Sequence, residues 1–396
     1  MAPYIGPYSE YLADRGYSQL VFWKKTFLVG VFSRWLDQQK IEAGGITVDH
    51  EEQFFHCYAK QHLLRGGERI ALSEVTCWLR QEGVISLTSI KAAELSEIDK
   101  NMLEYTSYLR DERGLAPTTI EVYAGAVRRF LTSIGGQCEL ELASVRATDI
   151  TDYIRRLAPK DRTFSAAKDM VTSLRSFFRF AQYRGFIKAD LAAAVPSVPG
   201  WSMISIPKAM PADCVRKLLD ESKTWHTPAG LRNRAILLLL ARLGLRAIEV
   251  TRLDLDDIDW RQGWLRVHGK GRQERPLPLP YDVGEAIASY LKGGRPQSTS
   301  RLVFLRSRAP YDGLKVGGDV GQIVRRAIRR AGIKLDVTGS HQLRHALAVD
   351  MLRQGLSLTE IGQMLRHRSP EATRKYAKVD LEGLREVALP WPGELP

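Results

Sequence analysis

The sequence predicts a mainly α-helical protein with a small antiparallel β-sheet in its second half, an α+β fold built from more than one domain. With 396 residues, the chain is longer than one ordinary domain. Apolar residues recur at helical spacing through almost all of residues 1–193. Residues 260–279 instead alternate in the manner of strands around the Gly-Lys-Gly turn at 269–271.

Prolines mark the boundary between the two halves. Residues 194–211 contain Pro196, Pro199, Pro207 and Pro211 and lack helical periodicity, which is typical of a linker. The predicted parts are an N-terminal helical extension (1–95), a helical domain (96–193), the linker (194–211), a second domain (212–390) and a tail (391–396).

The first half contains a candidate internal repeat. Residues 11–36 and 108–134 each open with Tyr-Leu, reach Arg-Gly after a few residues, and place a Phe sixteen residues after that Gly, at Phe32 and Phe130. A one-residue insertion is needed to align them. The pattern favours a second, degenerate copy of the helical domain in residues 1–95. Two helical hairpins that converge on similar patterns remain the alternative.

Residues 155–188 predict a basic helix with interleaved aromatic residues. Phe177, Phe178, Phe180 and Tyr183 are interleaved among Arg175, Arg179 and Arg184. A helix of this kind buries its aromatic rings in a core while its arginines face phosphates. A solvated basic face is the simpler alternative for this helix taken alone.

The second domain begins with a buried helix at 231–245. Residues 246–258 predict another helix that runs into strand-like sequence, and two strands follow within 260–279. RLVFL at 301–305 predicts one more strand. A basic amphipathic helix at 320–332 is closed by Gly332.

The last predicted helices have recognisable ends. Residues 340–355 form a helix that ends at Gly355. Ser357 and Glu360 make a capping box that opens the next helix. Ser369 followed by Pro370 starts a further helix, which carries Tyr376.

The charge of the chain points to a polyanionic partner. The net charge is +13 and the pI is near 9.6. Such an excess attracts nucleic acid, although a basic enzyme that binds no nucleic acid is an alternative. The four cysteines are scattered without a CxxC pair, which argues against a zinc ribbon or a disulfide framework and fits a reducing compartment.

No membrane association is expected from the sequence. The N-terminus has no apolar stretch of signal-peptide length, and the most apolar run, residues 235–241, is far too short to span a bilayer. We therefore expect a cytoplasmic protein.

Several residues of the second domain suit a phosphate site. His341 and Arg344 are three apart and share one face of a helix, where both can donate hydrogen bonds to phosphate oxygens. His345 also lies near this face, but a zinc site is disfavoured because Gln342 stands where the metalloprotease pattern needs Glu. Arg246 follows a buried helix that can aim it.

Three further candidates complete the set. Lys270 lies at the tip of the predicted hairpin, and His367 precedes Tyr376 by nine residues in a basic segment. A tyrosine is a suitable nucleophile for phosphoryl transfer, because the phenol has a pKa near 10 and its oxyanion leaves more readily than an alkoxide.

In this order the residues resemble the tyrosine recombinase (phage integrase) family. Its pattern of Arg, Lys, His-x-x-Arg, His or Trp, and Tyr matches Arg246, Lys270, His341 with Arg344, His367 and Tyr376. The flanking words LGLRAIEV and HQLRHALA resemble the two arginine boxes of the family, with Glu249 at the position of a structural acid. Residues 208–380 resemble the catalytic domain, and residues 97–190 more loosely resemble the helical core-binding domain. Arg366 stands where the family usually has Gly, and its side chain would either add a phosphate contact or crowd the turn before His367.

The resemblance implies a site-specific DNA recombinase. In that case Tyr376 attacks to give a 3′-phosphotyrosyl link and a free 5′-hydroxyl, without metal, ATP or another cofactor. Arg246 and Arg344 hold the non-bridging oxygens, and His367 adds a hydrogen bond. Lys270 protonates the leaving 5′-oxygen, and His341 assists deprotonation of Tyr376.

The resemblance also implies partners and a setting. The expected partners are double-stranded DNA at specific inverted-repeat sites and three further recombinases, in a homo-tetramer or a hetero-tetramer. A terminal helix at 380–389 would pack onto a neighbouring protomer or fold back on its own domain. The long N-terminal region favours DNA integration or transposition of a mobile genetic element. A catalytically idle DNA-binding accessory protein and a type IB topoisomerase-like activity are the alternatives.

Overall fold

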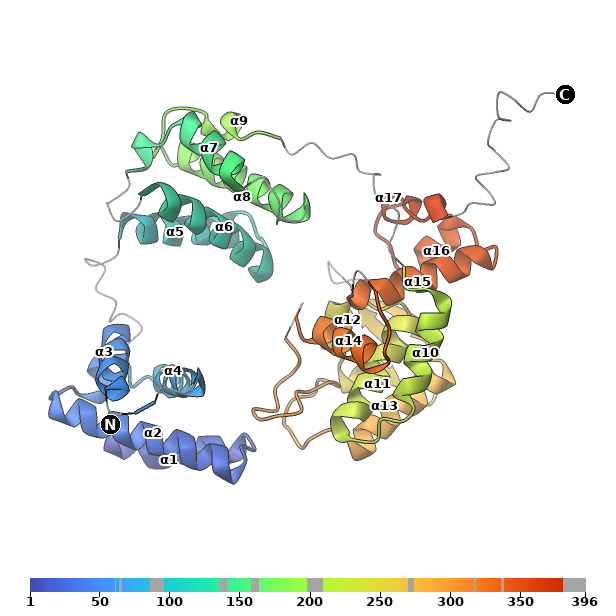
Figure 1. The fold of residues 1–396 in the computed structure, drawn as a ribbon, viewed down its shortest axis with the longest axis horizontal. Coiled ribbons are helices and arrows are strands. Elements are labelled where there is room, and N and C mark those ends of the chain that lie inside the picture. The colour runs from blue at the N-terminus through green and yellow to red at the C-terminus, as the bar shows by residue number, and fades with distance from the viewer. Residues whose placement is uncertain are drawn as a thin grey trace. The chain divides into compact units, whose positions relative to one another are not determined.

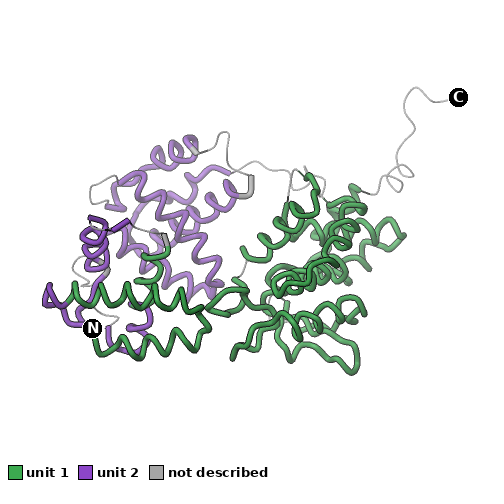
Figure 2. Tube along the Cα trace, turned by 60° about the horizontal axis from the view of Figure 1, so that its bottom comes forward, with its two compact units in different colours: residues 1–36, 66–75, 205–396 green, residues 37–65, 76–204 purple. Residues whose placement is uncertain are grey.

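The fold is known from a computed structural model of the chain. It describes residues 1–60, 62–63, 66–85, 96–135, 141–157, 164–197, 209–269, 274–315, 318–335 and 338–379. Lys270, most of the predicted linker and the predicted terminal helix at 380–389 lie outside these residues. The chain divides into two compact units (Figure 2), residues 1–36, 66–75 and 205–396 in one and residues 37–65 and 76–204 in the other.

The N-terminal residues are helical throughout. The elements are a 3-10 turn η1 (Ala2–Tyr4), α1 (Ile5–Asp14), α2 (Gln19–Gln38), a second 3-10 turn η2 (Ala43–Gly45), α3 (Val48–Ala59) and α4 (Gly66–Gln81) (Figure 1). Thr47 caps α3, because its side chain accepts a hydrogen bond from the backbone N–H of His50. Within the first unit, Lys25 of α2 forms an ion pair with Glu74 of α4.

A second helical set follows between residues 97 and 194. It contains α5 (Glu97–Ser107), a π-helical turn η4 (Tyr108–Glu112), α6 (Pro117–Gly135), a 3-10 turn η5 (Leu142–Ser144), α7 (Ala147–Leu157), α8 (Phe164–Tyr183) and α9 (Leu191–Ala194). Its core holds Phe177, Phe178 and Phe180, while Arg179 and Arg184 of the same region are exposed. The predicted division is confirmed for these residues, but Tyr183 is exposed instead of buried, and Arg175 donates a hydrogen bond to the carbonyl of Val195 instead of facing outwards.

From their long helix onwards, α2 or α6, the two helical sets share one order of elements as far as the second glycine. In both, a glycine with positive φ (Gly16 at 70° and Gly114 at 57°) precedes a long helix, α2 or α6. A 3-10 turn and two more helices follow, and a second positive-φ glycine comes after the last of them, at Gly83 and Gly185. Phe32 and Phe130, which the sequence comparison paired, are both buried. Duplication of one module would produce this shared order of helices and glycines in the two sets.

The second half of the chain forms an α+β domain. Its elements are α10 (Ala212–Ser222), α11 (Pro228–Arg242), α12 (Ala247–Thr251), η6 (Leu255–Asp257), β1 (Ile258–Asp259), β2 (Trp264–His268), β3 (Glu274–Pro278), α13 (Tyr281–Gly293), α14 (Asp319–Arg330), α15 (Ser340–Arg353), α16 (Leu358–Met364), α17 (Glu371–Arg374) and η7 (Ala377–Val379). Helix α11 is buried along most of its length and packs against α10, α13 and α15. This helix is the centre of the core.

The sheet is small and antiparallel, with the order β1-β2-β3. Leu265 of β2 pairs with Ile258 of β1 and with Leu277 of β3, so the predicted hairpin is confirmed on both sides of its turn. Together with the helices, the sheet confirms the predicted fold class.

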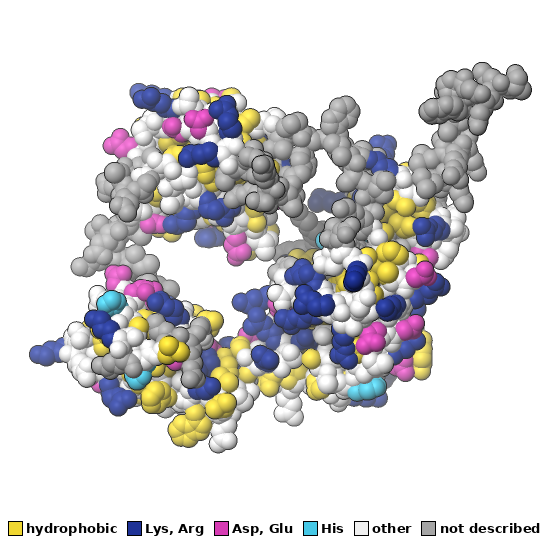
Figure 3. All heavy atoms as spheres, viewed as in Figure 1, with side chains coloured by type: hydrophobic (Ala, Val, Ile, Leu, Met, Phe, Trp, Pro, Cys, Tyr) yellow, Lys and Arg dark blue, Asp and Glu magenta, His cyan; other side chains and the backbone are white. Residues whose placement is uncertain are grey.

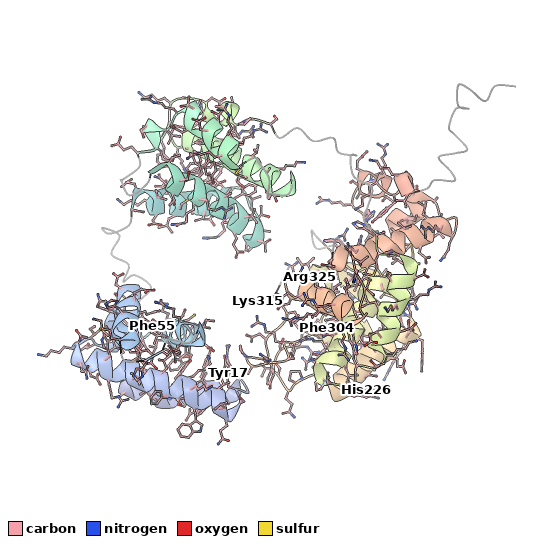
Figure 4. The ribbon with its side chains drawn as sticks, viewed as in Figure 1. Tyr17, Phe55, His226, Phe304, Lys315 and Arg325 are labelled. Carbon is pink, nitrogen blue, oxygen red and sulfur yellow. The ribbon has the colours of Figure 1, made fainter. Side chains whose placement is uncertain are left out.

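One predicted strand is wrong. Residues 301–305 take part only in the isolated bridges Asp254↔Leu302 and Leu305↔Gly313. Val303 and Phe304 (labelled in Figure 4) are buried in the core of the domain, and Leu305 is buried as well. The apolar run reflects burial of consecutive side chains in the core, without a ladder to a neighbouring strand.

No helix among the described residues is both long enough and apolar enough to cross a membrane.

Candidate active site

Arg246 is positioned by the turn that ends α11. Gly244 has a φ of 58°, and an added Cβ would lie 2.7 Å from Cδ2 of Leu365, so this turn needs glycine both for its conformation and for its packing. Arg246 then caps α12. Its backbone N–H donates to Oε2 of Glu249 at 2.8 Å, and its Nη1 donates to Oε1 of the same residue at 2.7 Å.

Arg344 is held by two backbone carbonyls. It lies on α15, is only 4% exposed, and donates to the carbonyl oxygens of Gly244 and Leu365. Burial, together with the charges of Arg246 and Arg366, lowers the pKa of Arg344 to about 10, which still leaves the guanidinium charged at neutral pH. Arg246 Nη2 donates to the next carbonyl along the chain, that of Arg366, at 3.2 Å. Arg246 and Arg344 therefore bond to the carbonyls of two consecutive residues, Arg366 and Leu365.

Tyr376 lies in the turn between α17 and η7. The sequence predicted a helix that carries Tyr376, but α17 spans only Glu371–Arg374 and ends before it. The side chain is 0% exposed, and its hydroxyl oxygen lies 2.7 Å from Nδ1 of His345. Burial raises the pKa of Tyr376 to about 12 although the charges of Arg344 and Arg246 lower it, so the phenol is protonated at neutral pH.

His367 follows a turn in which Arg366 adopts a φ of 55°. The N–H of Arg366 donates to Gln363 O at 3.0 Å and that of His367 to Gly362 O at 2.8 Å, the hydrogen-bond pattern of a Schellman motif closing α16. Nδ1 of His367 lies 2.6 Å from Oγ1 of Thr373, and its ring stacks against Tyr376 at a centroid distance of 6.3 Å. Burial and the charges of Arg344 and Arg246 lower the pKa of His367 to about 4.

The charges of the site have an excess of cations. Arg246, Arg344 and Arg366 interact with one carboxylate, that of Glu249, and Lys375 adds a further positive charge beside His345 and His367. Burial raises the pKa of Glu249, but the backbone hydrogen bond from Arg246 and the charges of Arg366 and Arg246 outweigh it, so its pKa lies below the ordinary value. Burial and the charge of Lys375 lower the pKa of His345 to about 4, which leaves its imidazole neutral and able to accept a proton. Such a site can bind an anion and take up a proton beside it.

The structure brings together five of the six predicted residues, namely Arg246, His341, Arg344, His367 and Tyr376. His341 is one turn before His345 on α15, with their ring centroids 6.4 Å apart, and among the described residues it makes no hydrogen bond to Tyr376. Lys270 lies outside the described residues.

Three contacts of this site were not predicted. His345 was considered only as a metal ligand, although its position four residues after His341 already placed it near the same helix face. Arg366 points inwards to Glu249, with Nη2 3.1 Å from Oε2, instead of reaching outwards for a phosphate. The ammonium of Lys375 lies 5.1 Å from the centre of the Tyr376 ring.

Across the described part of the chain, His, Cys, Asp and Glu side chains form no cluster of three or more that could hold a metal ion.

Comparison with protein families matches residues 208–382 to the phage integrase family and residues 103–185 to the phage integrase N-terminal SAM-like domain. The protein y4rA of Sinorhizobium fredii, named as an integrase/recombinase, is 45% identical over 395 residues, which cover 100% of this chain and 95% of y4rA. The chain belongs to the phage integrase family.

Other members of the phage integrase family match most of the chain. The tyrosine recombinase XerD of Mycobacterium tuberculosis is 33% identical over 309 residues, which cover 74% of this chain and 96% of XerD. The crystal structure of a lambda integrase dimer bound to a COC′ core site has a TM-score of 0.55 at 18% identity, covering 70% of this chain and 94% of that chain, which shows a shared fold. This phage integrase family member is therefore a tyrosine-type recombinase, an enzyme of site-specific DNA recombination, and an idle accessory protein is not favoured.

Proposed function

We propose that this recombinase cleaves and rejoins DNA with Tyr376 as nucleophile, through a 3′-phosphotyrosyl intermediate. The observation that supports this assignment most directly is the surrounding of one buried phenol. Two imidazoles flank Tyr376, and the guanidinium of Arg344 is held by the carbonyl of Leu365 in the turn that precedes His367. Phosphoryl transfer needs a nucleophile, positive charge and a proton acceptor, and side chains of this chain supply all three.

In the proposed step, the oxygen of Tyr376 bonds to the scissile phosphorus and the bond from phosphorus to the 5′-oxygen breaks. Arg246 and Arg344 neutralise the non-bridging oxygens, and His367 donates one hydrogen bond to them. The leaving 5′-oxygen takes a proton from Lys270 and becomes a hydroxyl. The reverse reaction, with a 5′-hydroxyl of another strand, releases Tyr376 and restores a phosphodiester, so the energy of the bond is conserved.

The proton of the Tyr376 hydroxyl requires an acceptor. The family resemblance gives this role to His341. The 2.7 Å contact favours His345, whose neutral ring accepts the hydroxyl proton when its own proton is on Nε2. We assign the first proton transfer to His345 and leave His341 to bind the phosphate.

We propose that double-stranded DNA with inverted-repeat sites is the substrate. Support comes from the basic surface around α14, where Arg325, Arg326, Arg329 and Arg330 are all exposed. Figure 3 shows Lys and Arg side chains gathered where α12 and α14 lie, and Figure 4 labels Arg325 and the exposed Lys315, which precedes α14. Arginines on one helix face bind the phosphate backbone and fix the protein on the duplex.

We further propose that four recombinases assemble on two DNA sites, either four copies of this chain or a mixture with partner recombinases. Residues 1–95 then form a second core-binding-like module, followed by the core-binding domain (96–193), the linker (194–211) and the catalytic domain (212–390). The repeated order of helices supports the duplicated module. The match to XerD leaves about a quarter of this chain uncovered, whereas the match to y4rA, which is named as an integrase/recombinase, covers all of it. This pattern favours integration or transposition of a mobile element. We place this activity in the cytoplasm.

Trapping the covalent intermediate tests the proposal. Nicked duplexes carrying DNA from either side of the protein's own gene release a short fragment that bears the free 5′-hydroxyl, so that the adduct accumulates and survives SDS. Wild type should give this band and Tyr376→Phe should not. Tyr290→Phe is the matched control, because it removes the hydroxyl of another buried tyrosine within the same domain. A band that persists in Tyr376→Phe would overturn the assignment of the nucleophile. Specific binding without a band from wild type would favour an accessory protein, and relaxation of supercoils without strand exchange would favour a type IB topoisomerase-like activity.

A further inference from the structure

The carboxylate of Glu249 is shared by two guanidinium groups. Oε1 accepts from Arg246, whereas Oε2 accepts from the backbone of Arg246 and, at 3.1 Å, from Nη2 of Arg366. Glu249 is only 4% exposed. A carboxylate buried to this extent is costly unless a cation stays paired with it.

Arg366 occupies a backbone position that favours glycine. Its φ of 55° lies in the left-handed region, which is strained for a residue with a side chain. The family that the chain resembles usually has glycine here, and glycine would avoid this strain. The arginine side chain is nevertheless folded into the protein and is 7% exposed, with Glu249 as its carboxylate partner. The contact with Glu249 offsets the strain of the turn.

Arg246 can bind a phosphate without giving up its present partners. Its Nη1 is bonded to Glu249 and its Nη2 to the carbonyl of Arg366, but a guanidinium has five N–H donors and this side chain is 33% exposed. The direction of its remaining donors therefore depends on where the carboxylate of Glu249 is held. With glycine at position 366, Glu249 would keep Arg246 as its partner but lose the bond from Nη2 of Arg366 to Oε2.

We infer that Arg366 is a positioning residue, which holds the carboxylate of Glu249 in place so that Glu249 in turn holds Arg246 towards the scissile phosphate. The inference rests on the proposed function, because it concerns the phosphate that Arg246 binds during strand cleavage. Arg366 itself does not touch the DNA. It acts through Glu249, and thereby through the backbone of Arg246, on the geometry of the phosphate site.

Three variants of Arg366 separate this role from a structural one. Arg366→Gly removes the guanidinium and relieves the turn, Arg366→Ala removes the guanidinium and keeps the strain, and Arg366→Lys keeps both the charge and the strain. Arg368→Ala is the matched control, because it removes one positive charge from an exposed position close to the same turn. The readout is the single-turnover rate of adduct formation on the nicked duplex, with saturating protein, from pH 5 to 9.

The expected result is a 10-fold to 100-fold lower rate for Arg366→Gly and Arg366→Ala, of the order that misplacement of a catalytic group causes. The acid limb of their pH profile should move to higher pH, because Glu249 loses a cation in the DNA complex and takes up a proton more readily. Arg366→Lys should recover much of the rate, and Arg368→Ala should keep the wild-type profile.

The outcomes are distinct. If Arg366 only filled the turn, Arg366→Gly would be at least as active as wild type with an unmoved acid limb, and the inference would be overturned. A wild-type protein that forms no adduct would contradict the proposed function instead.

Discussion

The hydroxyl oxygen of Tyr376 lies 2.7 Å from Nδ1 of His345, across 31 residues of sequence. The phenol has a pKa of about 12 and the imidazole one of about 4, so at neutral pH the proton stays with Tyr376. If Tyr376 is the nucleophile as proposed, transfer of that proton is unfavourable until the bond to phosphorus begins to form. The contact then positions the phenol without ionising it.

Replacement of His345 by glutamine should slow strand cleavage. The amide oxygen of His345→Gln can still accept a hydrogen bond from Tyr376 but cannot take its proton, and the loss of a general base costs about 100-fold or more. Single-turnover adduct formation on the nicked duplex measures the rate. His341→Gln serves as the comparison, since His341 makes no such contact among the described residues. A large loss in His341→Gln with a normal rate in His345→Gln would return the role of base to His341.

The stability of the recombinase should fall on acidification between about pH 6.5 and pH 4. His345 and His367 have pKa values of about 4 in the folded protein against 6.5 for an ordinary imidazole, so the unfolded chain binds protons more readily. Their contribution to stability is thus present above pH 6.5 and is lost as the pH falls towards 4. The midpoint of thermal unfolding, followed by circular dichroism at several pH values, should drop less in His345→Gln/His367→Gln than in wild type. If the unfolding midpoints of wild type and the double variant fell equally with pH, groups other than these two histidines would control acid unfolding.

Substitution of Gly244 by alanine should damage both stability and cleavage. A Cβ there would meet Leu365 and Leu347 at 2.7 and 3.0 Å in a left-handed turn, and Arg344 depends on the carbonyl of Gly244. We expect a loss of about 1–3 kcal/mol in the free energy of unfolding and a lower rate of adduct formation. Gly263→Ala is the matched control, because Gly263 has a φ of 69° but no atoms within 4 Å of the added Cβ. Similar losses in both variants would mean that backbone strain alone is responsible.

Arginines on α14 should strengthen DNA binding, and their contribution should weaken as the salt concentration rises. Each phosphate contact adds roughly 0.9 to the slope of log affinity against log salt concentration. The double variant Arg325→Ala/Arg326→Ala should therefore reduce the slope by about 2 on a duplex of arbitrary sequence. Fluorescence anisotropy over a range of NaCl concentrations measures it. Arg216→Ala, on α10, removes an exposed arginine that pairs with Asp213 and should leave the slope unchanged. An unchanged slope in the double variant would place the DNA elsewhere.

Local signals in the sequence predicted local structure well. Ser357 and Glu360 form the predicted capping box, and Gly332 and Gly355 follow the ends of their helices with positive φ. These features depend on neighbouring residues only, so short patterns contain the information. The strand predicted at 301–305 failed because apolar residues in a row report burial and do not specify which partner buries them.

The assembly of the site could not be derived from spacing. Arg344 bonds to a carbonyl 100 residues away and Arg246 to one 120 residues away, and only the family resemblance placed these residues together. Neither residue spacing nor the family resemblance predicted that the side chain of Arg366 points inwards. Its direction depends on a left-handed turn, and the family usually has glycine at this position.

The complete enclosure of Tyr376 has a consequence for the host cell. Nearly all DNA that a recombinase meets is the wrong DNA, and the arginines of its surface hold such DNA regardless of sequence. A side chain that solvent cannot reach is also out of reach of a phosphate. If Tyr376 is the nucleophile as proposed, a stray encounter should therefore end in dissociation with both strands intact, and cleavage should wait for a productive complex that exposes the hydroxyl of Tyr376.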